Sequence, residues 1–219
     1  MSKKAWFFVA FFAALVAAFY ITLTSLIPDF SRPKLPVLSY VQPFSFRNQN
    51  GQVITERDVQ GKVFVAEYFF TTCQGICKKM NRNLEKVYQK YGSNPGFLIL
   101  SHTVDPGTDS VARLKRYADS LKVSSDSWWF LTGSKDSLYM QARRSYLLDS
   151  RENDTIPITE QFIHTQFFSL VDREGRVRKI YDGLKKEELE QMEKDIASLL
   201  NERPGKVVFV NHLFGNTPN

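Results

Sequence analysis

A long uncharged segment near the N-terminus constrains this chain more than any other feature. No Asp, Glu, Lys or Arg occurs from Ala5 through Pro28, and most residues between them are apolar. At about 1.5 Å per residue, a helix of this length crosses a hydrocarbon core about 30 Å thick. We therefore predict a cytoplasmic N-terminus at residues 1–4 and a transmembrane anchor at 5–28.

The charges around this segment indicate its orientation. Lys3 and Lys4 precede it, which favours a cytoplasmic N-terminus and an exported remainder. The alternative is a cleaved signal peptide, but its apolar core would span only about 7–15 residues. We expect a single-pass protein of the bacterial cytoplasmic membrane, with the C-terminal domain on the outer, periplasmic face.

The composition of the chain indicates one globular domain beyond the anchor. Hydrophobic residues make up 43% of the 219 residues and charged residues 24%, which excludes a disordered chain. Two cysteines are too few for a disulfide-rich scaffold, and the three histidines lie too far apart for a zinc finger. The net charge of +6 comes without a basic stripe interleaved with aromatic residues, so we expect no nucleic-acid partner.

Proline marks the limits of this domain. Pro33, Pro36 and Pro43 predict an extended tether at 29–43, because proline removes backbone hydrogen-bond donors. A Pro-Gly pair begins a C-terminal tail at 204–219, where the apolar run 207–210 is either an extra edge strand or part of a loosely docked tail. The domain itself is expected at 44–203.

Within 44–203, strands alternate with helices. Two alternating segments flank an Asn-Gly turn in 44–55 and predict a β-hairpin. We expect an α/β fold with parallel pairing through right-handed crossovers, and a late hairpin that adds antiparallel edge strands. The expected strands are 63–70, 97 to about 105, 128–131, 167–171 and 177–181, and the expected helices are 73–91, 111–121, 138–146 and 184–199.

Cys73 and Cys77 stand where the first buried strand is expected to give way to a helix. Their spacing of four predicts that both sulfurs share one helical face, and the helix N-terminus favours thiolates. Thr72 is a candidate helix cap. Two activated thiolates chelate a soft metal or oxidise to a disulfide. The alternatives are two incidental cysteines or a structural disulfide, which would close only a tiny loop.

Other polar residues have more ordinary interpretations. Glu67 lies inside the buried strand, where a carboxylate is costly unless it is paired or protonated, so it either relays a proton or reaches the surface or a lysine. His102 and His212 are expected to be ordinary core or surface histidines. Asp105 and Asp109 are expected to cap a turn and the helix that follows.

Four motifs together resemble one family. They are the Cys-x-x-x-Cys after a buried strand, Thr103-Val104-Asp105-Pro106 followed by Asp109, Leu131-Thr132-Gly133, and His164 just before the late hairpin. Over roughly residues 44–200 the chain resembles the Sco/SenC proteins, which are copper-binding factors for cytochrome c oxidase assembly. The resemblance implies a thioredoxin-like fold with an N-terminal β-hairpin, a central mixed sheet and flanking helices, preceded by one transmembrane helix.

The resemblance also implies a metal site. Cys73, Cys77 and His164 would bind one copper ion, as Cu(I), Cu(II) or both, because thiolates suit Cu(I) and an imidazole keeps the site usable by Cu(II). The implied function is a copper chaperone that delivers copper to the binuclear copper centre of cytochrome c oxidase. Its partner would be the copper-bearing subunit of the oxidase or another exported thiol protein.

The motif also departs from the family pattern. Gln74 and Gly75 replace the usual Pro-Asp, and Lys78 replaces the second Pro. These differences, together with Glu67, motivate the alternative of an exported thiol–disulfide oxidoreductase that keeps partner cysteines reduced, with Cys73 as nucleophile. Nothing in the sequence selects a copper-responsive sensor, and a four-residue cysteine spacing is unusual for a peroxidase.

Overall fold

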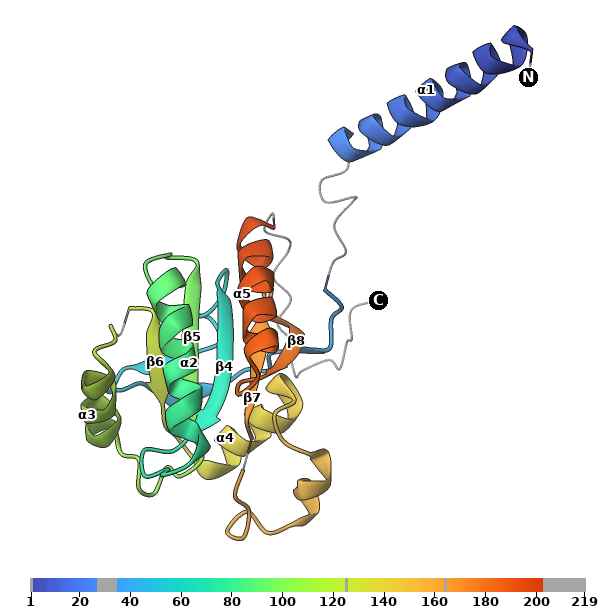
Figure 1. The fold of residues 1–219 in the computed structure, drawn as a ribbon. Coiled ribbons are helices and arrows are strands. Elements are labelled where there is room, and N and C mark those ends of the chain that lie inside the picture. The colour runs from blue at the N-terminus through green and yellow to red at the C-terminus, as the bar shows by residue number, and fades with distance from the viewer. Residues whose placement is uncertain (1, 27–34, 125, 164, 203–219) are drawn as a thin grey trace. The chain divides into compact units, whose positions relative to one another are not determined.

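The computed structural model describes residues 2–26, 35–124, 126–163 and 165–202 of the chain, which is drawn in Figure 1. The chain divides into two compact units, Met1–Leu35 and Pro36–Asn219. The predicted tail 204–219, including His212, lies outside the described residues, as does His164.

The first unit contains a single apolar helix. Helix α1 runs from Lys3 to Leu26. Its segment Lys3–Ser25 has a mean hydropathy of 2.3. A helix of this length and composition fits a membrane anchor or a signal sequence.

A six-stranded mixed sheet forms the centre of the second unit, in the order β1-β8-β7-β4-β5-β6. Strand β4 pairs in parallel with β5, and β5 in parallel with β6, whereas β7, β8 and β1 join antiparallel on the other side of β4. The mixed sheet expected from the sequence is confirmed. The strands are β1 (Ser39–Tyr40), β4 (Val63–Phe69), β5 (Phe97–Thr103), β6 (Trp128–Leu131), β7 (Phe167–Val171) and β8 (Arg176–Asp182).

The expectation that the late hairpin lies at the edge of the sheet is wrong. Strand β7 pairs with the central strand β4, and β1 covers the outer side of β8. Residues just outside β1 extend this pairing, since Leu38 N–H donates to Val177 O at 2.8 Å. A short segment far away in sequence therefore supplies the edge, which local pattern does not reveal.

The N-terminal hairpin forms as predicted. Strands β2 (Ser45–Arg47) and β3 (Val53–Thr55) pair antiparallel as a separate two-stranded sheet. Gly51, in the connecting turn, has a φ of +78°, which glycine adopts without strain. Arg47 adds a bridge to Thr132 and so joins this hairpin to the end of β6.

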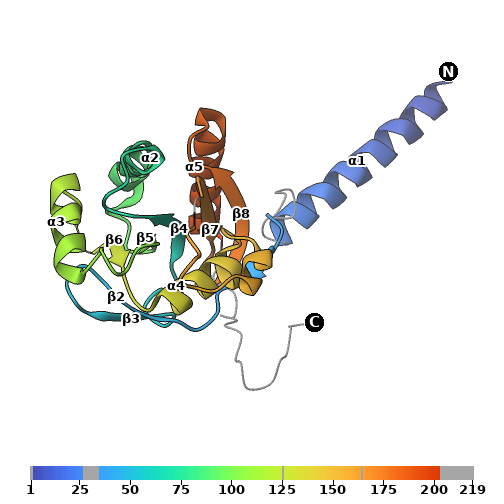
Figure 2. The same cartoon turned by 90° about the horizontal axis from the view of Figure 1, so that it is seen from below.

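Helices cover both faces of the central sheet (Figures 1 and 2). Helices α2 (Ile76–Tyr91), α3 (Val111–Leu121) and α5 (Lys186–Asn201) lie on one face. Helix α4 (Lys135–Gln141) and the β2–β3 hairpin lie on the other. All seven residues of β4 and all seven of β5 are buried between these layers, as the nearly continuous apolar sequence of β4 and the apolar start of β5 predict.

The segment after β6 departs from the single helix that the sequence predicts over 138–146. Helix α4 ends at Gln141 and continues as a π-helical turn, η1 (Ala142–Tyr146). A short 3-10 helix, η2 (Arg151–Thr155), follows in the long connection to β7. Single π-helical turns inside α-helices frequently occur at functional sites.

Candidate functional site

The two cysteines lie at the carboxyl end of β4, but they do not share a helix. Helix α2 begins at Ile76, and its N-cap residue Gly75 provides no side-chain cap. Cys73 therefore lies in the loop ahead of the helix, where its N–H donates to Phe70 O at 3.2 Å. The expected helix start at Cys73 and the cap at Thr72 are both wrong, because the chain first makes a turn after β4.

A buried carboxylate holds this loop in place. Asp109 is fully buried and accepts hydrogen bonds from the backbone N–H of Thr71 at 3.1 Å and from its hydroxyl at 2.5 Å. The hydroxyl of Thr103, the last residue of β5, donates to the same carboxylate at 2.6 Å. Arg113 Nε donates to the Thr71 hydroxyl at 2.7 Å. The loop that carries Cys73 is thus tied to the neighbouring strand and to α3.

This role of Asp109 differs from the one that the sequence suggests. Helix α3 is capped by Ser110, whose hydroxyl accepts from the backbone N–H of Arg113, so Asp109 is not the helix cap. Asp105 does cap its turn, because its side chain accepts from the N–H of Thr108. A local motif does not distinguish a cap from a carboxylate that bonds to a residue 38 positions away.

Cys73 has the lower pKa of the two thiols and the more exposed side chain. It is partly exposed, and burial alone would raise its pKa. Hydrogen bonds from the Cys77 thiol and from the backbone N–H groups of Cys77 and Gly75, with the charge of Lys78, outweigh this burial and lower the pKa of Cys73. The sulfur thus occupies the position of the missing side-chain cap and accepts from N–H groups that the start of a helix leaves unpaired.

Cys77 has the opposite character. It is buried, and burial together with the neighbouring Cys73 raises its pKa to about 12. The charge of Glu67 raises the pKa of Cys77 further. The expectation that both thiols are activated is therefore wrong for Cys77, because its position on the inner side of the helix removes it from solvent.

Glu67 lies behind the cysteines inside the sheet. Its side chain is fully buried, which raises its pKa to about 8, so the carboxyl is largely protonated at neutral pH. Ser101 on β5 donates to Glu67 Oε1 at 2.5 Å, and Trp128 Nε1 donates to the Ser101 hydroxyl at 2.8 Å. Glu67 Oε2 has no partner among the described residues. The expected alternative, in which Glu67 reaches the surface or a lysine, is wrong.

A cavity of about 380 Å³ opens beside the two thiols. Its walls are mainly apolar, and they come from the end of β4, the start of α2 and the segment just before β7. Ile163 and Thr165, the residues on either side of His164, both line it. The lining residues are Tyr68, Phe69, Phe70, Cys73, Gln74, Gly75, Ile76, Cys77, Val104, Ile163 and Thr165.

An arginine that the sequence does not single out anchors the segment before His164. Arg143, presented by the π-helical turn η1, is buried and pairs with Asp149 at 2.6 Å and with Asp154 at 2.9 Å. It also donates to the side chain of Gln161, whose backbone carbonyl accepts from Lys135 Nζ at 2.7 Å. Arg143 lies in a π-helical turn that the sequence does not predict. In the expected regular helix it would resemble an ordinary surface arginine.

His102, the residue after Ser101 on β5, does not line the cavity beside the two cysteines. It is fully buried, which lowers its pKa to about 4 and keeps it neutral. Its ring stacks on Tyr68 with centroids 5.0 Å apart, and Nδ1 lies 3.3 Å from the backbone oxygen of Glu67. The ordinary core role expected for His102 agrees with this environment.

The donor atoms of the cavity determine what it can bind. No group of three His, Cys, Asp or Glu side chains gathers to hold a metal anywhere in the part of the chain that the structure describes. The cavity itself offers two sulfurs in apolar surroundings, which suits a soft monovalent ion or a disulfide and disfavours Mg²⁺ or Ca²⁺.

Comparison with known proteins places this geometry in context. The SCO1/SenC family model matches residues 34–201. The SCO1 protein homolog of Bacillus subtilis (strain 168) is 31% identical over 169 residues, which cover 75% of this chain and 85% of that protein. BsSco, a member of the Sco family of cytochrome c oxidase assembly proteins in which a disulfide switch was identified, is similar in structure. It is 32% identical with a TM-score of 0.63, over 77% of this chain and 97% of that chain.

A more distant structure shares the fold. The structure of ScoI from Bradyrhizobium japonicum with copper bound has a TM-score of 0.57 and 21% identity, over 74% of this chain and 99% of that chain.

Proposed function

Because this chain belongs to the SCO1/SenC family, we propose that it binds one copper ion through Cys73, Cys77 and His164 and delivers it to the binuclear copper centre of cytochrome c oxidase. Sco family proteins are copper-binding proteins of cytochrome c oxidase assembly. The observation that carries the proposal is the shared cavity, in which two free thiols face the residues that flank position 164.

The different pKa values of the two thiols suggest an order of events. Cys73, partly exposed and with a lowered pKa, is the first sulfur to engage incoming Cu(I). Cys77 remains protonated until the metal displaces its proton, since thiols bind metal as thiolates. Three protein ligands leave an open position through which an acceptor thiolate enters, and ligand exchange then transfers the cargo.

Export and membrane attachment belong to the same proposal. Helix α1 would anchor the protein in the bacterial cytoplasmic membrane, with Lys3 and Lys4 in the cytoplasm and the sheet domain on the outer face. The predicted tether at 29–43 is too long, because Ser39 and Tyr40 form strand β1 of the sheet. The folded domain predicted at 44–203 therefore also includes this strand, and a shorter tether before it remains part of this proposal.

A specific observation also favours the thiol–disulfide alternative. The pair consists of an outer thiol with a lowered pKa and a buried thiol with a raised one. In this reaction, the Cys73 thiolate attacks a partner disulfide, forms a mixed disulfide and releases one partner sulfur as a thiolate. In molecules whose Glu67 is ionised, Cys77 gives its proton to Glu67 and attacks the Cys73 sulfur, which releases the second partner sulfur. Glu67 then passes the proton to one released thiolate, and the other takes a proton from water. The partner leaves with two reduced thiols and two electrons, while Cys73 and Cys77 end as a disulfide.

A copper titration tests the main proposal. The full chain in detergent is reduced anaerobically and titrated with Cu(I) against a competing chelator. We expect one tightly held ion for the wild type, none for Cys73→Ser/Cys77→Ser, and unchanged binding for the control Thr72→Ser. His164→Ala should keep Cu(I) but lose the thiolate-to-Cu(II) absorption band. Equal copper retention by wild type and the double variant would rule out the chaperone.

A second experiment separates the two functions. Reduced full chain is mixed with a disulfide-bonded peptide, and the appearance of free peptide thiols is followed. Rapid exchange that is insensitive to His164→Ala but reduced at least about tenfold by Glu67→Gln supports the oxidoreductase. If no exchange is measurable while copper binding persists, the oxidoreductase alternative is excluded.

A further inference from the structure

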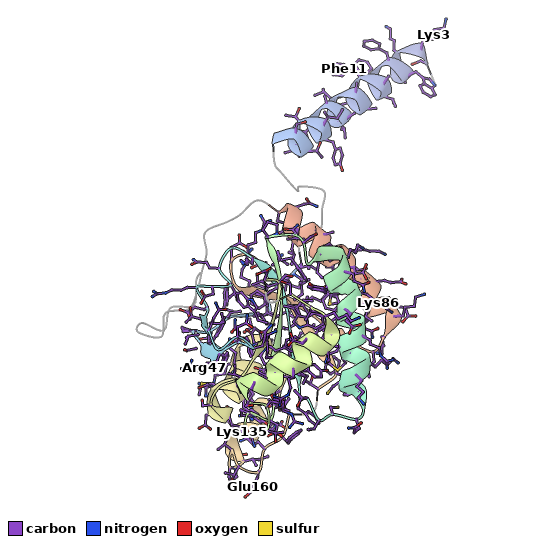
Figure 3. All side chains as sticks on the ribbon, turned by 90° about the vertical axis from the view of Figure 1, so that its left-hand side faces the viewer. Lys3, Phe11, Arg47, Lys86, Lys135 and Glu160 are labelled. Atoms are coloured by element: carbon purple, nitrogen blue, oxygen red, sulfur yellow. The ribbon has the colours of Figure 1, made fainter. Side chains whose placement is uncertain are left out.

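The surface beside the cysteines carries a concentration of positive charge. Helices α2 and α3 together contain eight basic and two acidic residues, a net charge equal to the +6 of the whole chain. Asn81 on α2 donates to the hydroxyl of Tyr117 on α3 at 2.7 Å, so the two helices lie side by side. Figure 3 shows Lys86 on the outer side of α2.

Most of these charges are uncompensated. Five exposed cations on the two helices make no ion pair with any residue in the described ranges, and we call them the α2–α3 basic face: Lys78, Lys79, Arg82, Lys86 and Arg116. A hollow of about 330 Å³ continues this face toward the cysteines. Arg113, Arg116 and Thr71 contribute to its lining, and Thr71 lies two residues before Cys73.

Apolar surface adjoins this face at the opening of the cavity. Ile76, at the first turn of α2, is 40% exposed, and Phe162, whose ring lies 5.2 Å from that of Phe70, is 43% exposed. An apolar centre next to the reactive thiol with charged residues around it has the composition of a transient protein interface. Positive charge that only kept the protein soluble would not need to lie beside the apolar surface at the cysteines.

We propose that the α2–α3 basic face docks an acidic segment of the thiol-bearing protein that exchanges copper or a disulfide with Cys73. The inference rests on the proposed function and adds the charge of the partner. Complementary charge would speed the encounter and orient the partner's thiols toward the cavity. A membrane surface is disfavoured as the occupant, because lipid against the first turn of α2 would cover the thiol that the partner must reach.

Binding and exchange are tested separately with synthetic peptides. A first set of three peptides contains two cysteines flanked by four Glu, four Gln or four Lys residues. A second set of three has the same flanking residues, a fluorescent label and Ser in place of Cys. Full chain in neutral nanodiscs should bind the Glu form of the Ser set at least about tenfold more tightly than the Gln form at low salt. The preference should shrink at about 0.3 M salt, because ions screen exposed charges.

Matched charge reversals locate the docking face. K79E/R82E should abolish or reverse the preference for Glu, whereas E187K/E190K on α5, with the same number of changes, should leave it intact. Equal binding of all three peptides, or equal effects of the two double variants, would overturn the docking face. The docking face would also be overturned if phosphatidylglycerol in the nanodisc protected Cys73 from an alkylating reagent, because this result would assign the face to lipid.

The Cys-containing set keeps this result distinct from failure of the proposed function. If the Glu peptide binds through the basic face but neither copper nor a disulfide is exchanged, the function fails and the docking face stands. If both reactions proceed at the same rate with all peptides and binding shows no charge preference, the function stands and the docking face fails.

Discussion

Helices α2 and α5 have the same length, 16 residues, and pack on the same face of the sheet, yet their charges are opposite. Helix α2 has five basic residues and one acidic, and among the described residues Lys90 is the one cation of this helix in an ion pair. Helix α5 has five acidic and two basic residues, and four of its five acids are paired. Ion pairs therefore tie most acids of α5 to neighbouring residues, whereas most cations of α2 form no ion pair with the described residues and belong to the proposed docking face.

The same contrast holds for the carboxylates near each helix. Asp195 on α5 accepts from Tyr181 Oη at 2.7 Å and from Gln191 Nε2 at 2.9 Å, so both oxygens are bonded. Glu67 has one oxygen bonded to Ser101, and its other oxygen has no partner among the described residues. A buried group that remains incompletely bonded costs stability, which is characteristic of functional sites.

The largest expected effect is a dependence of folding stability on pH, which follows from the incompletely bonded Glu67. Glu67 has its pKa raised from 4.5 to about 8, so between these values the unfolded chain releases the proton and the folded chain keeps it. Wild-type stability should therefore fall as pH rises across this window, by at most about 1.4 kcal/mol per unit. Glu67→Gln should remove this fall and gain on the order of 4 kcal/mol over wild type at pH 8.

Urea unfolding of the full chain in detergent at several pH values measures this effect. Asp195→Asn is the matched control, because both oxygens of the Asp195 carboxylate accept hydrogen bonds. Parallel stability curves for wild type and Glu67→Gln would contradict the burial of an uncompensated acid behind the cysteines.

The next effect concerns the N-terminal end of α2. Because its pKa is lowered and its sulfur is partly exposed, Cys73 should react with iodoacetamide at pH 7 at least about 100-fold faster than Cys77. The single variants Cys73→Ser and Cys77→Ser allow each rate to be measured alone. Unfolding in guanidinium should make the rates similar, and similar rates in the folded protein would refute the assigned asymmetry.

The smallest effect tests the attachment of the cysteine loop. Asp109→Asn removes a buried charge that accepts from Thr71 and Thr103, and we expect a loss of about 2 kcal/mol. Glu188→Gln on α5 provides the comparison, since among the described residues Glu188 accepts one hydrogen bond, from the N–H of Asp182, and lies in an ion pair 4.0 Å from Lys185 Nζ. Its cost should stay near 0.5 kcal/mol. Equal unfolding midpoints for the two variants would remove Asp109 as the anchor of the loop.

Much of the architecture could be predicted because it depends on local pattern. The β2–β3 hairpin follows from its Asn-Gly turn, and the buried strand β4 follows from a continuous apolar run. The edge strand β1 could not be predicted, since two residues pair with β8 more than 130 positions later. The π-helical turn η1 was likewise missed, because it forms within a segment that has an ordinary helical pattern.

The site divides in the same way. By itself, the sequence determined the apolar helix α1, the thiol pair at the end of a buried strand, and the soft-metal or disulfide chemistry of two sulfurs. Only the tertiary structure decided that Cys73 is the reactive thiol and Cys77 the buried one, that Glu67 is enclosed, and that Asp109 holds the loop. A side chain's chemistry is inherent in its type, whereas its pKa and partners depend on burial and on N–H groups that folding brings near.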